Sequence, residues 1–147
     1  MRGVLRLSVL VFAVAFSVDL LAKEWAVSHN VGTLLYNDTA SQFPLRIVFC
    51  VVAVAVAVVL GRFARSRGLG RQWGLGIGAS LLVAGVLANG VSSFLWARGV
   101  PDFIDVEGGW VWNLADFEIA IGMTGGILSV AVSAVATYAR GLRAAER

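Results

Sequence analysis

Four long apolar stretches alternate with short polar ones along the chain of 147 residues. The apolar stretches cover about 4–22, 44–60, 73–96 and 112–138. Each suits the run of about 20 apolar residues that an α-helix needs to cross a bilayer. The pattern therefore predicts an all-α integral membrane protein, with four transmembrane helices in one domain that covers residues 1–147.

The first apolar stretch has two interpretations. Arg2 and Arg6 before an apolar core are typical of a cleaved signal peptide. However, the run is longer than the core of such a peptide, Asp19 interrupts its end, and no A-x-A cleavage site follows. These features favour a retained membrane span.

Composition leaves no room for a sizeable soluble domain. Hydrophobic residues make up 59% of the chain and charged residues 14%, whereas soluble domains average about 45–50% and about 25%. The single cysteine, Cys50, cannot form an internal disulfide, and the single histidine, His29, lacks partners for a metal site. We therefore do not expect a metalloenzyme.

Basic residues set the expected orientation. Nine of the twelve fall on one side of the predicted spans, and the positive-inside rule places that side and both termini in the cytoplasm. A small extracytoplasmic platform would follow helix 1, and a short loop would precede helix 4. The net charge of +3 then reflects topology and gives no reason to expect a nucleic-acid partner. The nine residues are Arg2, Arg6, Arg62, Arg65, Arg67, Arg71, Arg140, Arg143 and Arg147.

Two carboxylates at the outer boundary are the candidate chemistry. Asp102 precedes the last apolar stretch, and Asp116 lies near the start of that stretch, three residues after Asn113. Acids in or near hydrocarbon are costly, so they indicate function. Two adjacent carboxylates share a proton, and such a dyad can hydrolyse an amide. By spacing alone, a proton relay or an ion path would have the same pattern.

The residues around the two acids resemble a known family. V-P-D-F at 100–103 and N-L-A-D-F-E-I-A-I-G at 113–122 are similar to the motifs of lipoprotein signal peptidases (signal peptidase II). These are four-span aspartyl proteases of the bacterial inner membrane. The resemblance implies that Asp102 and Asp116 are the catalytic residues.

Weaker matches extend the resemblance over nearly the whole chain. N-V-G at 30–32 resembles the N-x-G that follows the family's first span, and D-L-L-A-K at 19–23 keeps the ends of D-Q-x-T-K. Ala88-Asn89 stands where the family has G-N. By resemblance, the residues that bind substrate or support the dyad are Asp19, Lys23, Asn30, Gly32, Asn89 and Asn113.

The resemblance implies an endopeptidase that removes signal peptides from diacylglyceryl-modified prolipoproteins. Cleavage would fall before the lipid-modified cysteine, at the outer face of the bacterial cytoplasmic (inner) membrane. Its partners would be the prolipoprotein signal peptide and membrane lipids. The protein would act as a monomer, without a metal or cofactor.

Two departures leave alternatives open. Ser92 and Ser93 replace an acid and an arginine of the family, and Leu20 replaces a glutamine; nearby Arg98 could substitute for the arginine. A catalytically impaired relative that acts in membrane binding or assembly therefore remains an alternative. So does a proton-coupled carrier, although a carrier predicts acids at mid-bilayer, and here they gather at one end.

Overall fold

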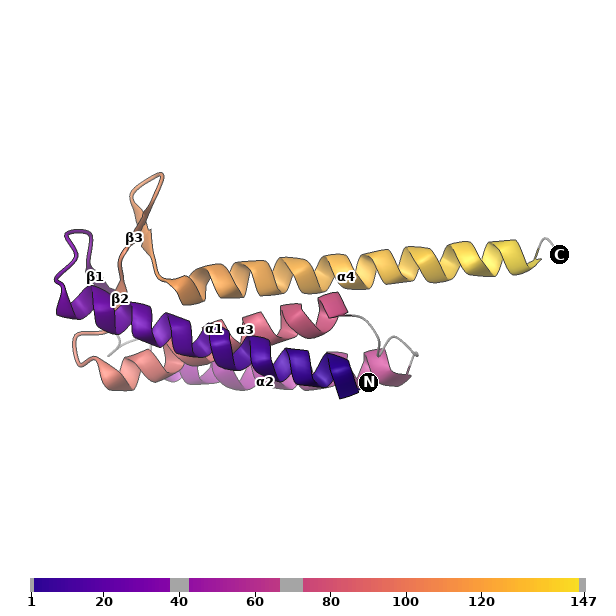
Figure 1. The fold of residues 1–147 in the computed structure, drawn as a ribbon, viewed down its shortest axis with the longest axis horizontal. Helices are drawn as coiled ribbons and strands as arrows, with labels where there is room; N and C mark the ends of the chain where they lie inside the picture. The colour runs from indigo at the N-terminus through magenta and orange to yellow at the C-terminus, as the bar shows by residue number, and fades with distance from the viewer. Residues whose placement is uncertain (1, 38–42, 67–72, 146–147) are drawn as a thin grey trace.

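The computed structural model describes residues 2–37, 43–66 and 73–145. Four helices run along a common axis, and short strands gather at one end, opposite the two termini (Figure 1). In chain order the elements are α1 Arg2–Ser28, β1 Leu35–Asn37, α2 Phe43–Ser66, α3 Trp73–Leu95, β2 Val100–Asp102, β3 Ile104–Val106, β4 Trp110–Trp112 and α4 Leu114–Ala145.

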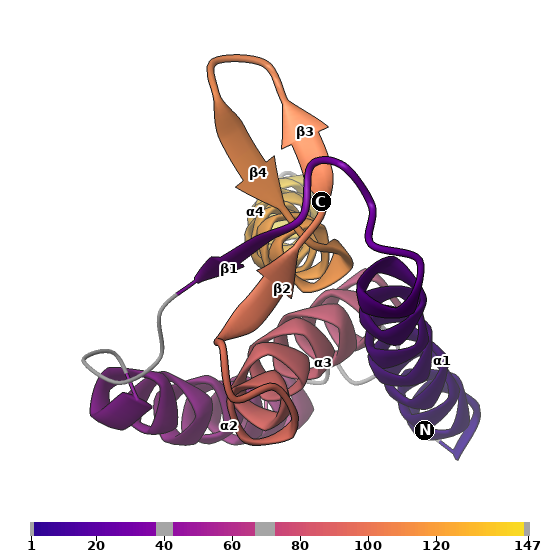
Figure 2. The same cartoon turned by 90° about the vertical axis from the view of Figure 1, so that its left-hand side faces the viewer.

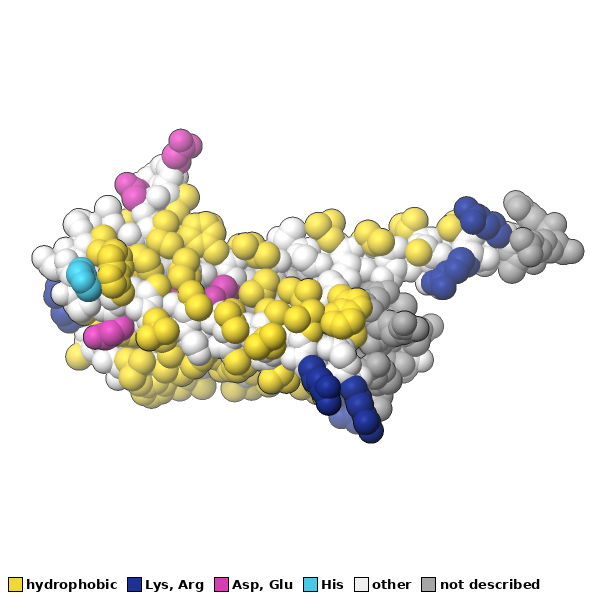
Figure 3. All heavy atoms as spheres, in the orientation of Figure 1, with side chains coloured by type: hydrophobic (Ala, Val, Ile, Leu, Met, Phe, Trp, Pro, Cys, Tyr) yellow, Lys and Arg dark blue, Asp and Glu magenta, His cyan; other side chains and the backbone are white. Residues whose placement is uncertain are grey.

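Three of the described helices are long and apolar enough to cross a membrane. They are α1, α3 and the part of α4 from Leu114 to Arg143. The apolar part of α2, Ile47–Val59, is shorter, so a fourth span at 44–60 stays a prediction. Hydrophobic side chains cover much of the helical surface in Figure 3, as lipid contact requires.

Short strands at the end of the bundle add to the all-helical fold that hydropathy predicts. β1 pairs with β2 in antiparallel register, with Leu35 opposite Asp102, and β3 pairs with β4. The platform expected after the first helix is therefore built jointly by that segment and the one before α4. Pairing between residues so far apart in sequence leaves no mark on a hydropathy pattern.

Helix α1 ends later than its hydropathy predicts. The predicted span stops at residue 22, whereas the helix continues to Ser28 and buries Lys23 and Ala26. A lysine normally marks the exit from a membrane, but this one is paired inside the bundle. Asn30, with a positive φ of 48°, follows the helix and turns the chain.

Helix α3 lies at the centre and packs against α1, α2 and α4. Small residues allow α3 and α4 to approach closely. A Cβ atom on Gly78 would lie 2.8 Å from the carbonyl oxygen of Gly122, and one on Gly122 would collide with the backbone N of Leu82. This close packing brings the first turn of α4 against α3.

Candidate active site

Asn113 joins the two predicted catalytic aspartates. Its side-chain Nδ2 donates to Oδ1 of Asp102, and its backbone N–H donates to Oδ2 of Asp116 at 3.0 Å. Asp102 is 6% exposed and Asn113 only 1%. One buried residue thus fixes the positions of two carboxylates that come from β2 and α4.

The start of α4 explains how Asp116 is held. Asn113 directly precedes the helix, and Asp116 reaches back from the first turn to its N–H, as the acidic residue of a capping box does. The free N–H groups of a helix N-terminus also stabilise negative charge. The segment is therefore suited to hold a carboxylate at the end of a membrane helix.

A polar chain behind Asp116 connects three helices. Asn89 on α3 donates Nδ2 to Oδ1 of Asp116 at 3.0 Å, and its Oδ1 accepts from Nζ of Lys23 at 2.8 Å. Lys23 forms a 2.7 Å ion pair with Asp19, and both side chains are fully buried. Asp19 also accepts the N–H of Ala115 at 2.8 Å. The structure thus brings four predicted site residues, Asp19, Lys23, Asn89 and Asn113, to the dyad.

The buried ion pair makes α1 part of the site. Removing one partner of such a pair typically costs about 3–5 kcal/mol, because the other charge is left buried alone. Here Lys23 orients Asn89, and Asp19 holds the first turn of α4. The first helix therefore supports the dyad directly, and its retention as a membrane span stays a prediction.

Asn37 is a site residue that the sequence did not reveal. Its Nδ2 donates to Oδ2 of Asp102 at 3.3 Å, so each carboxylate oxygen of Asp102 accepts a hydrogen bond from a side-chain amide. Pairing of β1 with β2 brings it there, and Gly99, with φ of 120°, leaves space for the Asn37 carbonyl.

The guanidinium of Arg98 lies 4.3 Å from the centroid of the Tyr36 ring. Arg98 thus contacts β1.

Asn30 and Gly32 lie away from the described dyad contacts. Both are exposed, and neither lines the cavity beside the aspartates. Within the described ranges, Asn37 rather than Asn30 is the asparagine of this segment that reaches Asp102. The substrate role that the resemblance gives Asn30 and Gly32 stays a prediction.

Burial raises the pKa of the Asp102 carboxyl from an ordinary value of 3.8 to about 6. The nearby carboxylate of Asp116 raises this pKa further, whereas the hydrogen bonds from Asn113 and Asn37 lower it. Near neutral pH, a proton on Asp102 is therefore accessible at little cost.

A cavity of about 520 Å³ extends from the dyad between α2, α3 and α4. Polar groups line one end and apolar side chains the remainder, which is typical of small-molecule and peptide sites. The polar end consists of Asn37, Asn89, Asp102, Asn113 and Asp116, and the apolar part includes Leu45, Phe49, Val52, Val56, Leu82, Val86, Ile119 and Met123.

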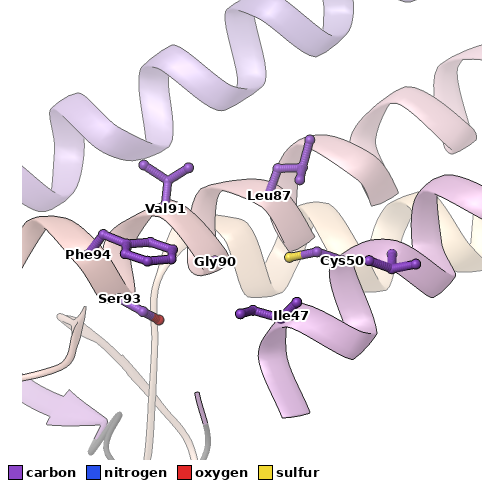
Figure 4. Close-up of a pocket in the computed structure, with 8 residues that line it drawn as sticks. Ile47, Cys50, Leu87, Gly90, Val91, Ser93 and Phe94 are labelled. Carbon is purple, nitrogen blue, oxygen red and sulfur yellow. The ribbon is translucent and has the colours of Figure 1, made fainter. Parts of the chain in front are cut away.

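Ser92 and Ser93 lie off the dyad. The Ser92 hydroxyl donates to the carbonyl of Ala88 at 2.6 Å, and the Ser93 hydroxyl donates to that of Asn89 at 3.1 Å. Ser93 of α3 and Cys50 of α2 both line a second, apolar cavity of about 190 Å³ (Figure 4). The two serines therefore leave the bonds to the aspartates intact.

Glu118 is a second residue that the sequence did not single out. It lies two residues after Asp116, on the face of α4 that packs against Gly85, and interacts electrostatically with Asp19 and Lys23. Its Oε2 is buried without a hydrogen-bond partner among the described residues. Glu118 therefore adds a further carboxylate near the Asp19–Lys23 pair.

The chain belongs to the signal peptidase II family. The family model described as "Signal peptidase (SPase) II" matches residues 11–132, which include every one of the site residues above. This match confirms the resemblance and identifies a bacterial membrane protease of the lipoprotein signal peptidase type.

Two solved structures share the fold. The first, described as "Bacterial membrane enzyme structure by the in meso method at 1.9 A resolution", is 18% identical, with a TM-score of 0.58. The match covers 84% of this chain and 91% of that one. A second structure, with the same description at 2.3 Å resolution, is 18% identical, with a TM-score of 0.59. The match covers 87% of this chain and 89% of the other. None of the curated proteins compared with the chain matches it in sequence.

Proposed function

We propose that this protein is an aspartic endopeptidase that removes signal peptides from diacylglyceryl-modified prolipoproteins. The observation that carries the proposal is the bridge from Asn113 to both Asp102 and Asp116 at the polar end of the cavity. Membership of the signal peptidase II family supplies the substrate class.

In the proposed first step, Asp102 carries the proton and Asp116 is ionised. This assignment is supported by the raised pKa of Asp102 and by the position of Asp116 in the first turn of α4. Asp116 takes a proton from water as the oxygen attacks the scissile carbonyl carbon, and Asp102 gives its proton to the carbonyl oxygen. A neutral tetrahedral diol results.

In the second step, the carbon–nitrogen bond breaks and the protons return. Asp116 gives its proton to the leaving amine, and Asp102 takes one from a hydroxyl of the diol as the new carboxyl group forms. The dyad is then back in its starting state. No charge builds up beyond the single negative charge that the dyad shares, which suits a site bordered by hydrocarbon.

Asn113 can serve both charge states of Asp102. Its Nδ2 donates to an ionised Asp102, while its Oδ1 is buried and has no hydrogen-bond partner in the described part of the chain. Turning the amide by 180° would direct Oδ1 at Asp102, where it can accept the proton of a neutral carboxyl. Each protonation state would then keep a hydrogen bond.

The cavity suits an apolar substrate. The residues that α2, α3 and α4 contribute beyond the dyad are mainly aliphatic or aromatic, and about 300–1,000 Å³ is usual for a site that encloses much of its ligand. The apolar segment of a signal peptide, or a diacylglyceryl chain, would lie along it. The scissile bond would then reach the aspartates at the polar end.

The dyad would face the outside of the cytoplasmic membrane. Supporting this orientation, exposed Arg2, Arg6, Arg140 and Arg143 lie on the helix ends far from the strands, while Asp105 and Glu107 lie on the hairpin beside the dyad. A translocated signal peptide would present its cleavage site on that side.

The test is cleavage of a diacylglyceryl-modified prolipoprotein by purified protein. We expect wild type to cleave it and both Asp102→Asn and Asp116→Asn to lose at least about a thousandfold in rate, because each variant lacks half of the acid–base pair. Asp105→Asn, in which the same change is made at an exposed acid, is the matched control and should cleave normally.

Activity that survives in either dyad variant would rule out the mechanism. A folded wild-type protein without activity, on substrate verified with another family member, would identify a catalytically impaired relative.

A further inference from the structure

The β3–β4 hairpin connects the two aspartates and projects from the bundle. It begins two residues after Asp102 and ends one residue before Asn113, and the N–H of Phe103 donates to the carbonyl of Trp112 at its base, at 2.9 Å. Figures 1 and 2 show that it extends across the direction of the helices, past α4 and away from α2. It therefore extends away from the cavity.

The hairpin has one wholly apolar face, and its acidic residues lie on the other face and at the tip. Because side chains alternate along a strand, the opposed pairs Ile104–Trp112 and Val106–Trp110 share one face, and the pair Asp105–Val111 lies on the other. Trp110 is 69% exposed. An exposed indole on a consistently apolar face is unexpected for a hairpin surrounded by water.

The apolar face is turned toward the length of α4. Trp112 packs edge-on against Phe117, in the first part of α4, with ring centroids 5.0 Å apart. Ile121, one turn further along, is 59% exposed. In Figure 3, hydrophobic side chains line the flank of the hairpin nearest α4, and acidic side chains occupy its tip and opposite flank.

We propose that the hairpin docks on the membrane surface at the dyad end of the helices. Val106 and Trp110 would enter the interfacial layer, and Asp105 and Glu107 would face water. α4 is long and apolar enough to cross the membrane, so its exposed apolar side lies in lipid. The hairpin runs across the direction of α4, and its apolar face adjoins the apolar side of that helix. Trp110 would then lie at the membrane–water interface, where an indole is favoured.

A lipid surface fits the hairpin better than a protein does. A specific protein interface usually buries about 1,200–2,000 Å² in total, whereas only Val106 and Trp110 of the apolar face extend beyond the part that packs on α4. Two side chains suffice for interfacial anchoring, because the helices already hold the protein in the membrane.

Docking would set the depth of the dyad. The two ends of the hairpin are joined to Asp102 and Asn113 by at most one residue, so a hairpin fixed at the surface fixes both carboxylates relative to the lipid headgroups. This inference concerns membrane position. It holds or fails independently of the proposed cleavage chemistry.

The test is nitroxide labelling of single cysteines. Cys50→Ser removes the only native cysteine, and Val106→Cys or Trp110→Cys labels the apolar face. Asp105→Cys and Glu107→Cys are the matched controls on the acidic side. The proteins are placed in vesicles of phosphatidylethanolamine and phosphatidylglycerol. We expect apolar-face labels to collide several-fold more with oxygen, relative to a water-soluble nickel chelate, than the control labels do.

Equal exposure of all four labels to the nickel chelate would overturn the proposal. Spin–spin broadening that depends on protein concentration would instead show a second copy on this face. Protection of position 110 only when a substrate peptide is added would show a lid. Either result would also overturn membrane docking. Using two positions on each face ensures that loss of the native Trp110 side chain cannot by itself decide the outcome.

Discussion

At the scale of single residues, each oxygen of the dyad accepts a hydrogen bond from an N–H group. Asn113 supplies two of these bonds, and Asn37 and Asn89 supply one each. Asn89 and Asn113 were identified from the sequence because each belongs to a short stretch that resembles a family motif. Asn37 lies in a strand whose register depends on pairing with β2, and no local pattern encodes that register.

Asn37→Ala should lower kcat/KM for prolipoprotein cleavage by about tenfold. In the proposed first step Asp102 gives up its proton and becomes charged, a hydrogen bond to a charged group is worth about 1.5–3 kcal/mol, and this bond is long. Asn37→Asp should lower it further, because a second carboxylate would then face Asp102. Steady-state cleavage measures both effects. Full activity in both variants would show that the Asn37 bond is irrelevant, and Asn30→Ala in the same assay tests the role implied by resemblance.

The raised pKa of Asp102 makes the stability of the protein depend on pH. Because this pKa is about 6 when folded and 3.8 ordinarily, the folded protein binds the proton more tightly than the unfolded chain. The stabilisation is complete below about pH 4 and is lost as the pH rises through about 6. Wild type should therefore lose about 2 kcal/mol relative to Asp102→Asn between about pH 4 and pH 7.

Unfolding of both proteins in detergent micelles across this pH range measures the difference. A difference that stays constant, or that favours wild type as the pH rises, would contradict a raised pKa for Asp102.

At the scale of elements, hydropathy located all four helices but misjudged their ends. The polar stretch from Lys23 includes the last turn of α1, because a buried ion pair allows the helix to continue. The last helix begins at Leu114, two residues later than predicted, because Trp112 belongs to β4. Charge pairing and strand pairing depend on residues that are distant in sequence, so the hydropathy pattern cannot reveal them.

Close packing of α3 against α4 predicts a contrast between two glycines of α4. Gly122→Ala should destabilise the protein by about 1–3 kcal/mol, because the added Cβ collides with the backbone at Leu82. Gly125→Ala should be neutral or stabilising by up to about 1 kcal/mol, since its Cβ meets open space and alanine favours the helix. Unfolding midpoints in detergent micelles measure both, and equal effects would contradict the packing described.

At the scale of the whole molecule, the order of motifs predicted the family and the dyad. The family match confirms the predicted family. The sequence could not show that the dyad rests on segments at both ends of the chain. Asp19 and Ala115 are joined across 96 positions, and Lys23 and Asn89 across 66. Contacts of this kind follow from how the helices assemble in three dimensions.

The bond between Asp19 and Ala115 also has a consequence for the timing of synthesis. The first helix leaves the ribosome long before the last. Until α4 enters the membrane, Asp19 lacks the N–H of Ala115, and Lys23 can pair only with Asp19 and with Asn89 of α3. Asp116 finds its amide partner only when α4 settles on α3. A nascent chain therefore has no assembled dyad, and proteolytic competence arises only at the last stage of membrane insertion.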